Sequence, residues 1–525
     1  MFKMELGFFG GVKDNITGSC TLVTITQRGR VTQFLIDAGD ITGSSKDPSI
    51  RAQELLKHFN PAKIKAVVAT HIHMDHIGII PMLIKYGFRG DIFCTRESKN
   101  LLVKVMLTDG AKIKREEGLR FANKARKEKA ASKNTKHYKF SSRGNRDKNR
   151  MIDKAARKNN HCHFEPLYTM EHVNLVSGLI KNGGIDYNQW TRIDDNIDLK
   201  FYRSGHVLGG GIVIIRIKDK NKYRYCCFSG DLGRKDDKLL SLKYPKEKID
   251  FMFMDSTYGG EIHAPRKIEE ERLVDIVSKA HSKNQQIIVP CFSLRTPKMI
   301  YDLTALMEKK LIPEVPICVY SPMGSKVVKE YADLWAKTGT LKNTDNISFN
   351  PFDPRQNKYL KIVETEAEIE KYEAMRKTVI YLAGAGMCHA GPIRKLLEDN
   401  LNNSEAIILL VGYMTKNTLG RKLFDGEAFV KMHGKEIEVK AEINILCYSD
   451  HADEPELIRY AKHVLSNLES PKDSITDKHL FIVHGEGSNA IALKKNLSKS
   501  LPSELGKKTT IVIPELNDKL VFQLN

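Results

Sequence analysis

Residues 70–78 read THIHMDHIG and place three histidines and one aspartate within six positions. The apolar run directly before them, IKAVVA at 64–69, has the length and composition of a buried strand. The four side chains therefore lie on a loop at a strand end, where rigid scaffolds usually present chemically active groups. Imidazole and carboxylate ligands together suit Zn²⁺ or Mn²⁺, so this stretch predicts a metal site.

The chain before residue 257 contains several more apolar runs of strand length. CTLVTIT (20–26) and VTQFLID (31–37) flank a short turn and predict a hairpin. Three further strands are predicted in this part, at 211–217, 223–229 and 250–255. Two helices are predicted, at 48–59 and 98–107. Alternating strands and helices predict an α/β fold, more closely a layered α+β arrangement.

From about residue 257 the pattern becomes a βα-type series with a sheet of its own. Helices are predicted at 267–282, 297–309 and 323–336, and strands at 285–290, 316–320, 378–383 and 406–412. After about residue 440 the chain returns to strands at 443–448, 479–483 and 509–513, with a helix at 454–466. A chain of 525 residues with two such patterns predicts more than one domain.

Composition narrows the class of protein. An apolar content of 41% with 28% charged residues is ordinary for a soluble globular chain. No apolar run reaches transmembrane length and the N-terminus lacks a signal-peptide pattern, so we expect no membrane contact and a cytoplasmic location. The nine cysteines form no CxxC pair and most lie in apolar runs, which favours reduced thiols over disulfides.

The formal net charge is +20, and much of it is local. Residues 112–158 hold 18 Lys and Arg against 5 Asp and Glu, a net of +13. Such clustering indicates a polyanionic partner. A flexible, solvated basic loop is the alternative, and the two interpretations are compatible because disordered basic segments bind phosphates well.

Three other segments place a single His or Asp next to glycine at a strand end, namely His206, Asp231 and His484. Glycine lets the backbone turn sharply and approach a metal closely. A binuclear site needs about seven or eight ligand positions, more than the first cluster supplies. Each segment alone is a weak signal, but together with residues 71–76 they predict a shared centre.

Together with Asp37 in FLIDAG, these residues resemble the metallo-β-lactamase superfamily in their order along the chain. The resemblance implies an αββα sandwich with a binuclear site at one edge of its two sheets. It implies two divalent ions, Zn²⁺ with Mn²⁺ as the alternative, and Asp37 would orient ligands without binding metal. By this likeness one ion is held by His71, His73 and His206 and the other by Asp75 and His76, with Asp231 bridging.

The chain also resembles the β-CASP nucleases within that superfamily. MDSTYG at 254–259 is similar to motif A with Asp255, YSDHAD at 448–453 to motif B with His451, and VHGE at 483–486 to motif C. The likeness implies an α/β β-CASP domain at 257–440, inserted into a lactamase-fold domain at 1–256 and 441–525 that carries a basic insertion at about 112–162. His484 at motif C would be the remaining ligand of the second ion, and a histidine there is typical of the RNA-acting branch with its RMMBL segment.

The predicted reaction is hydrolysis of a phosphodiester by a metal-activated hydroxide, with Asp75, Asp255 and His451 as catalytic residues. His451, held by Asp255, is the candidate acid for the leaving 3′ oxygen, and the products would carry a 5′ phosphate and a 3′ hydroxyl. The alternative for His451 is a residue at a helix N-terminus. Four further residues are predicted to bind substrate: Arg295, Ser321, Lys326 and Lys422. PCFSLRTPKMI at 290–300 departs from the family, with Arg295 and Thr296 where relatives usually carry a Gly-Arg pair.

These features predict a metal-dependent ribonuclease acting on single-stranded RNA in RNA processing or decay. The alternatives are a DNA nuclease, a small-molecule hydrolase of the same superfamily such as a thioesterase, and a nucleic-acid-binding subunit with an inactive site. Endonucleolytic and exonucleolytic modes both fit these motifs, and a homodimer fits as the assembly.

Overall fold

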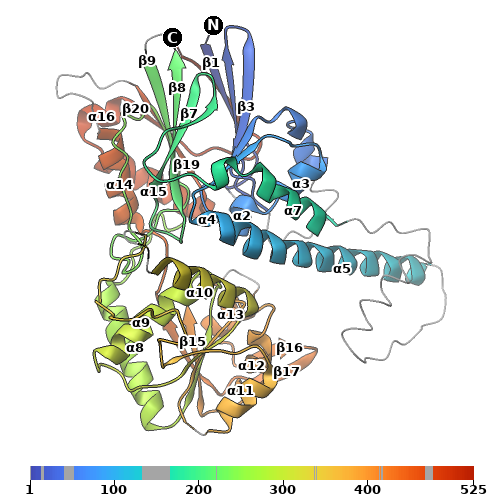
Figure 1. The fold of residues 1–525 in the computed structure, drawn as a ribbon, viewed down its shortest axis with the longest axis vertical. Helices are drawn as coiled ribbons and strands as arrows, with labels where there is room; N and C mark the ends of the chain where they lie inside the picture. Colours follow the sequence, from blue (N-terminus) through green and yellow to red (C-terminus); the bar gives the residue numbers. More distant parts are fainter. Residues whose placement is uncertain are drawn as a thin grey trace.

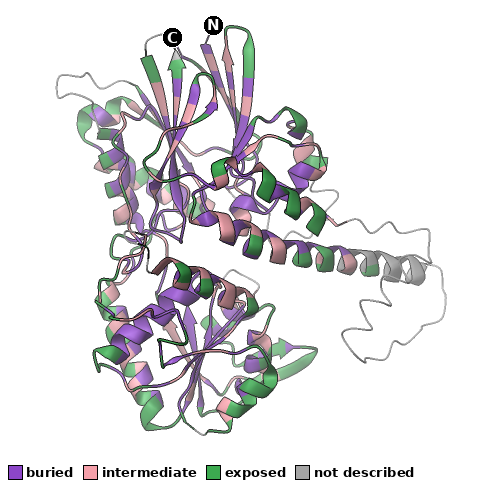
Figure 2. Ribbon diagram, in the orientation of Figure 1, coloured by how far each residue is buried: buried purple, intermediate pink, exposed green. Residues whose placement is uncertain are grey.

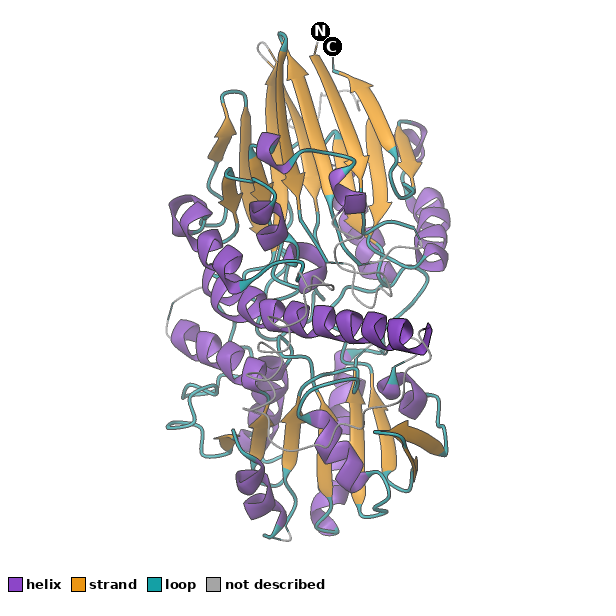
Figure 3. Cartoon of the chain, turned by 90° about the vertical axis from the view of Figure 1, so that its right-hand side faces the viewer, coloured by secondary structure: helices purple, strands orange, loops and turns teal. Residues whose placement is uncertain are grey.

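The computed structural model describes residues 2–13, 17–40, 53–132, 166–219, 222–335, 337, 340–375, 377–412, 414, 418–466 and 477–524. In Figure 1 the chain forms two units, one above the other. The upper unit contains two large sheets and both chain ends, and the lower unit contains a third sheet surrounded by helices. Figure 3 shows the same two tiers from the side, with helices between them.

The first sheet of the upper unit has the strand order β21-β1-β2-β3-β4-β5. Its strands are β1 (Phe2–Phe8), β2 (Thr21–Gln27), β3 (Arg30–Ile36), β4 (Ala66–Val68), β5 (Asp91–Phe93) and β21 (Lys519–Gln523). The second sheet has the order β20-β19-β10-β9-β8-β7-β6. Its strands are β6 (Thr191–Asp194), β7 (Ile197–Arg203), β8 (Gly211–Asp219), β9 (Lys222–Phe228), β10 (Phe251–Asp255), β19 (Lys478–Val483) and β20 (Thr509–Val512).

The two sheets pack face to face through the alternate apolar residues of their strands. Phe8 of β1, in the first sheet, lies 6.2 Å from Phe253 of β10 and 5.8 Å from Phe481 of β19, measured between ring centroids. α3 (Ile80–Lys85) and α7 (Met170–Leu179) cover the outer face of the first sheet, and α14 (Glu454–Ser466) and α15 (Gly487–Ser500) cover the second. The upper unit is therefore the predicted αββα sandwich, which buries strands on both faces (Figure 2).

The third sheet is parallel throughout and has the order β13-β12-β14-β11-β15-β18. Its strands are β11 (Gln286–Pro290), β12 (Ile317–Tyr320), β13 (Leu360–Ile362), β14 (Ile380–Ala383), β15 (Ala406–Val411) and β18 (Glu442–Leu446). The helices of this unit are α8 (Arg266–Ser282), α9 (Thr296–Glu308), α10 (Pro322–Trp335), α11 (Glu366–Glu373), α12 (Ile393–Asn400) and α13 (Leu419–Phe424). A small hairpin joins β16 (Phe429–Met432) to β17 (Lys435–Glu438). This arrangement is the expected α/β unit.

The strand predicted at 443–448 lies in a different sheet from the one we expected. As β18 it pairs in parallel with β15, from Ile407↔Glu442 to Val411↔Leu446. The third sheet thus extends past the predicted boundary at residue 440, because β15 is an apolar strand that needs a neighbour on this side. We propose a domain division in which the second unit ends after Leu446.

The basic stretch also begins differently from the expected loop. The helix predicted at 98–107 consists of α4 (Ser98–Asn100) and the π-helical segment η2 (Leu101–Leu107), and it continues as α5 (Thr108–Ser132). Residues 112–132 are therefore helical, while 133–165 lie outside the described residues, as do 48–52 of the helix predicted at 48–59. The remaining short helices are α2 (Met74–Ile77), α16 (Ser503–Lys507), η1 (Pro61–Lys63) and η3 (Lys181–Gly183).

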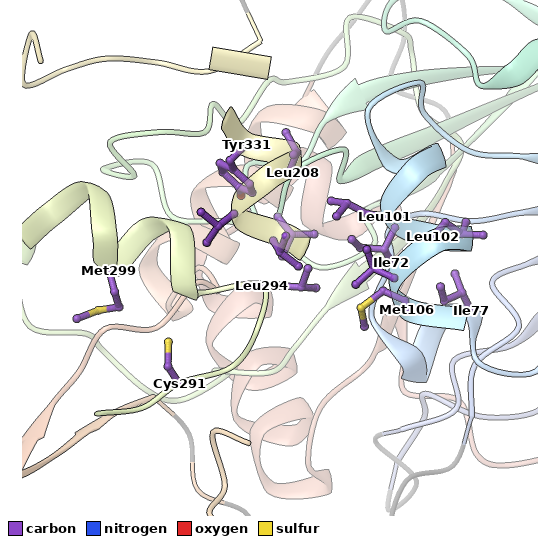
Figure 4. Close-up of a cluster of buried hydrophobic side chains, with 14 of the residues drawn as sticks. Ile72, Ile77, Leu101, Leu102, Met106, Leu208, Cys291, Leu294, Met299 and Tyr331 are labelled. Atoms are coloured by element: carbon purple, nitrogen blue, oxygen red, sulfur yellow. The ribbon is translucent and has the colours of Figure 1, made fainter. Parts of the chain in front are cut away.

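One apolar cluster continues from the upper unit into the lower one. Ile72 and Leu101 of the upper unit belong to the same buried cluster as Leu294, Met299 and Tyr331 of the lower unit (Figure 4). α9 and α10 are therefore fixed against the loops at the lower edge of the sandwich. Among the described residues, no helix combines the length and the apolar character needed to cross a membrane.

Candidate metal centre

The predicted ligands come together because they follow strands whose carboxyl ends share one edge. β10 pairs in parallel with β9 and β19, so Asp231, Asp255 and His484, which follow or end these strands, meet at that edge. β3 and β4 are likewise parallel, which brings Asp37 next to the loop at 71–76. The edge faces the lower unit, at the level between the two tiers in Figure 3.

One group of ligand atoms is formed by His71, His73, His206 and Asp231, all within 4.8 Å of one another. His71 Nε2 lies 3.0 Å from His73 Nδ1, and His206 Nε2 lies 3.2 Å from the same nitrogen. Asp231 Oδ2 lies 3.4 Å from His71 Nε2 and 3.5 Å from His206 Nε2. Three nitrogens and one oxygen thus converge on one point, which is the donor number of a tetrahedral Zn²⁺ site.

A second group is formed by Asp75, His76 and His484. His76 Nε2 and His484 Nε2 are 3.0 Å apart, and Asp75 Oδ2 is 3.5 Å from His484 Nε2. The other oxygen of Asp231, Oδ1, lies 3.3 Å from His76 Nε2. The Asp231 carboxylate therefore stands between the two groups, with one oxygen toward each.

Hydrogen bonds on the far side of the imidazoles fix which nitrogen is free. Asp37 Oδ2 accepts from His76 Nδ1 at 2.7 Å and from the Thr70 hydroxyl at 2.9 Å. Since that hydroxyl donates to Asp37, it accepts from His71 Nδ1 at 3.1 Å. Both Nδ1 atoms thus carry the proton, and both Nε2 lone pairs point into the centre, as ligation requires.

The electrostatics of the centre fit bound cations. Burial lowers the pKa of His73 to about 3 and lowers the pKa of His71 and His206 as well, which favours the neutral imidazoles that bind metals. Despite burial, His484 and its neighbours hold the pKa of Asp231 well below its usual range. Asp231 Oδ1 is buried without a hydrogen-bond partner. A buried carboxylate oxygen that lies 3.3 Å from His76 Nε2 and 3.4 Å from His484 Nδ1 without a hydrogen bond fits a site for a divalent ion.

Asp255 and His451 lie beside this centre. His451 Nδ1 is 3.6 Å from Asp255 Oδ2, and the His451 side chain is 20% exposed, whereas Asp255 is fully buried. Asp255 accepts hydrogen bonds from the Leu232 and Thr257 amides at 3.1 and 2.8 Å, which hold it in place. Burial opposes protonation of His451, but Asp255 and Asp231 raise its pKa. The imidazole can therefore carry a proton next to the candidate metal ligands.

The four residues predicted to bind substrate lie in separate places. Arg295 is buried and pairs with Asp450 at 2.8 Å, and the buried Ser321 hydroxyl accepts from the Gly324 amide at 3.0 Å. Lys326 pairs with Asp109 and Lys422 with Glu427, both at 3.2 Å and both with partly exposed side chains. Within the described part of the chain, Arg295 is the one of these four that contacts the segment carrying His451.

Two residues near the centre were not predicted, the buried Lys298 and the partly exposed Asp450. Lys298 Nζ lies 2.9 Å from Asp450 Oδ1, and the Asp450 carbonyl oxygen lies 3.3 Å from His206 Nδ1. The available signal was a lysine on the apolar side of the helix pattern TPKMIYDLTALM at 296–307. A lysine at such a position indicates a buried ion pair.

Comparison with known proteins assigns three domain types to the chain. The metallo-beta-lactamase superfamily matches residues 16–88, the Beta-Casp domain 296–423, and the Zn-dependent metallo-hydrolase RNA specificity domain (RMMBL) 436–514. A ribonuclease of Thermus thermophilus is 24% identical over 502 residues, which cover 94% of this chain and 96% of that protein. The transcription termination factor FttA of Methanosarcina mazei is 24% identical over 516 residues, covering 94% and 69%. An RNase J-like protein of Methanocaldococcus jannaschii is 24% identical over 505 residues, covering 94% and 96%.

Proposed function

We propose that this chain, which carries metallo-β-lactamase, β-CASP and RMMBL domains, is a metal-dependent ribonuclease that hydrolyses RNA phosphodiesters. The observation that carries the proposal is the position of the Asp231 carboxylate. Its Oδ2 faces the ligand group of His71, its Oδ1 faces the ligand group of His76, and His451 Nδ1 lies 4.0 Å from Oδ2. A phosphodiester needs charge stabilisation on its oxygens and a proton for its leaving group, and this arrangement offers residues for both.

Two divalent ions are the cofactors we propose, with Zn²⁺ favoured by the imidazole and carboxylate donors and Mn²⁺ as the alternative. One ion would be held by His71, His73 and His206, the other by Asp75, His76 and His484, and Asp231 would contact both. When bound, such ions lower the pKa of water to near neutrality and stabilise negative charge on phosphoryl oxygens.

The protein residues supply the proton for the leaving group. Protonated His451, held by Asp255, would donate to the departing 3′ oxygen, which leaves a 3′ hydroxyl and a 5′ phosphate. Asp255 keeps a charged carboxylate for this purpose, because the nearby His451 and His484 hold its pKa below the usual range against the effect of burial.

RNA is the favoured substrate because the RMMBL match is an RNA specificity domain and because a relative over nearly the whole chain is a ribonuclease. The inserted second unit and the net charge of +20 argue against a small-molecule hydrolase. We further propose single-stranded RNA in processing or decay, and a cytoplasmic location, which free and mostly buried cysteines support. The homodimer stays a prediction.

The experiment that tests the proposal is the variant Asp75→Ala, assayed on a labelled single-stranded RNA. We expect cleavage to be lost while the circular dichroism spectrum and the thermal midpoint stay close to those of the unchanged protein. Asp186→Ala is the control, because Asp186 lies on the surface in an ion pair with Arg96 at 2.7 Å. Cleavage by Asp75→Ala at the rate of the control would contradict the assignment.

A further inference from the structure

Lys298 is a buried lysine whose ammonium group joins three separate loops of the upper unit. Its side chain is 6% exposed, and Nζ lies 2.8 Å from Asp237 Oδ2 and 2.9 Å from Asp450 Oδ1. Nζ also donates to the carbonyl oxygen of His206 at 2.9 Å. An ammonium group has three protons, so each of them is used by one of these oxygens.

The three oxygens belong to segments that border the metal centre. His206 is one of the proposed ligands, and Asp450 directly precedes His451. The Asp450 carbonyl oxygen lies 3.3 Å from His206 Nδ1, so the two segments also touch each other. Asp237 in turn accepts from the amides of Leu239 and Leu240 at 2.9 and 2.7 Å and is itself fixed by its own loop.

Lys298 reaches these segments from the other unit. It lies on α9, and Met299 of this helix and Leu294 just before it belong to the apolar cluster shared by the two units (Figure 4). Arg295, one turn earlier, adds a second cation to the same carboxylate, at 2.8 Å from Asp450 Oδ2. The position of the ammonium is thus set by the packing between the units, and the backbone around His206 and His451 is set by the ammonium.

We propose that Lys298 is a positioning residue that holds the His206 and Asp450–His451 segments in the geometry needed for metal binding and catalysis. It acts from the second unit and touches neither RNA nor metal. The residues that orient metal ligands typically change affinity or activity by about 10- to 100-fold when they are replaced. The inference rests on the proposed function, but its effect on metal retention can be measured without any RNA.

The test is Lys298→Gln in the full chain, with two readouts. With RNA, we expect kcat to fall about 10- to 100-fold while KM changes less than about threefold, because the buried side chain does not bind substrate. Without RNA, we expect a chelator to remove zinc at a concentration about tenfold lower than for the unchanged protein. Unchanged kcat and zinc retention would overturn the proposal, and so would a raised KM at constant kcat.

Asp302→Asn is the matched control, since Asp302 is also a buried residue of α9. The substitution likewise removes an ion pair, the one with Arg266 at 2.6 Å. We expect this control to lower the thermal midpoint without changing kcat or zinc retention. If it reduces both as much as Lys298→Gln does, a general loss of stability explains the effect and the positioning role is wrong.

Asp450→Asn is the second variant, and it tests the same contact even if Lys298→Gln fails to fold. It keeps the side-chain volume of Asp450 and its backbone carbonyl group. We expect it to reproduce the loss of kcat and zinc. Combined with Lys298→Gln, it should cause little further loss, because both changes break the same link. Fully multiplicative losses would contradict a shared link. If the unchanged protein cleaves no RNA, the proposed function fails while the zinc measurement still decides the role of Lys298.

Discussion

Asp37 decides the orientation of two imidazoles, although it is not placed to bind a metal. It accepts from His76 Nδ1 at 2.7 Å, and from the amide and hydroxyl of Thr70 at 2.8 and 2.9 Å. Through Thr70 it also fixes His71. We therefore expect the strength of metal binding to depend on hydrogen bonds one layer away from the proposed ligands.

We predict that Asp37→Asn lowers the affinity for zinc by about 10- to 100-fold while the chain stays folded. The amide group has one acceptor oxygen in place of two, so it cannot accept at once from His76 Nδ1 and from the Thr70 amide, which donate to different oxygens of Asp37. Zinc content after dialysis against a graded series of chelator concentrations measures the change. Zinc retention equal to that of the unchanged protein would show that Asp37 does not orient the ligands.

His263 gives a prediction for stability as a function of pH. Burial, and then the charge of Arg234, lower the pKa of His263 to about 4 in the folded chain, whereas an unfolded histidine has a pKa of about 6.5. Between these values the unfolded chain binds more protons, so His263 reduces the free energy of unfolding as the pH falls from about 6.5 toward 4.

We expect His263→Gln to remove part of this loss. Urea unfolding at pH 7 and pH 5 provides the measurement, with the two proteins compared at each pH. The difference in unfolding free energy between the two pH values should be smaller for the variant. An equal or larger difference would mean that His263 titrates normally in the folded chain.

At the scale of elements, the metal loop is held by the loop that follows β3 and by Ser19, which lies just before β2. The amides of Ser19, Ala38 and Asp40 donate to the carbonyl oxygens of Asp75, His76 and Met74 at 2.7 to 2.9 Å. Gly39 lies within this contact, and a Cβ atom there would stand 1.7 Å from the Asp75 carbonyl oxygen. No side chain fits without moving the loop that carries the ligands.

We therefore predict that Gly39→Ala displaces Asp75 and reduces both zinc content and RNA cleavage by at least about tenfold. Gly178→Ala is the control, because a Cβ at this position in α7 meets no atom within 4 Å and alanine favours a helix. A Gly39→Ala protein with full zinc content and normal cleavage would show that the two loops move independently.

The elements also show what the sequence can and cannot predict. The hairpin of β2 and β3 and the ligand loop after β4 follow from local patterns, since apolar alternation and histidine spacing are visible in a few residues. The predicted boundary at residue 440 separates INILCY from the sheet in which β18 pairs with β15, because this segment is apolar enough for either sheet and only the register between distant strands distinguishes them.

The residues of the candidate site also fall into two groups, those that the sequence can reveal and those that it cannot. Chemistry-bearing residues such as His71, Asp231 and His484 could be found from residue type and from family resemblance. Lys298 and Asp450 could not, because their role exists only where α9 packs against the other unit. A contact between units depends on tertiary packing, of which a linear pattern carries almost no trace.

At the scale of the whole molecule, charge should govern how RNA is bound. The chain carries a formal net charge of +20, and residues 133–158 alone contain 10 Lys and Arg against 2 Asp and Glu. Each phosphate contact releases counterions, so we expect RNA affinity to fall steeply with salt concentration. Deletion of residues 133–158 should weaken binding and flatten this dependence while kcat stays within about threefold. An unchanged slope would exclude this stretch from RNA binding.

The central claim, that the buried His–Asp centre is a metal-dependent ribonuclease site, is tested most directly by one cleavage assay. The purified chain is stripped of metal and then given zinc or manganese, with RNA and DNA oligonucleotides of the same sequence as substrates. We predict no cleavage without metal, and cleavage of the RNA on addition of metal, with products that carry 5′ phosphates and 3′ hydroxyls. Cleavage of the DNA in preference to the RNA, or cleavage of RNA that persists after complete removal of metal, would contradict the claim.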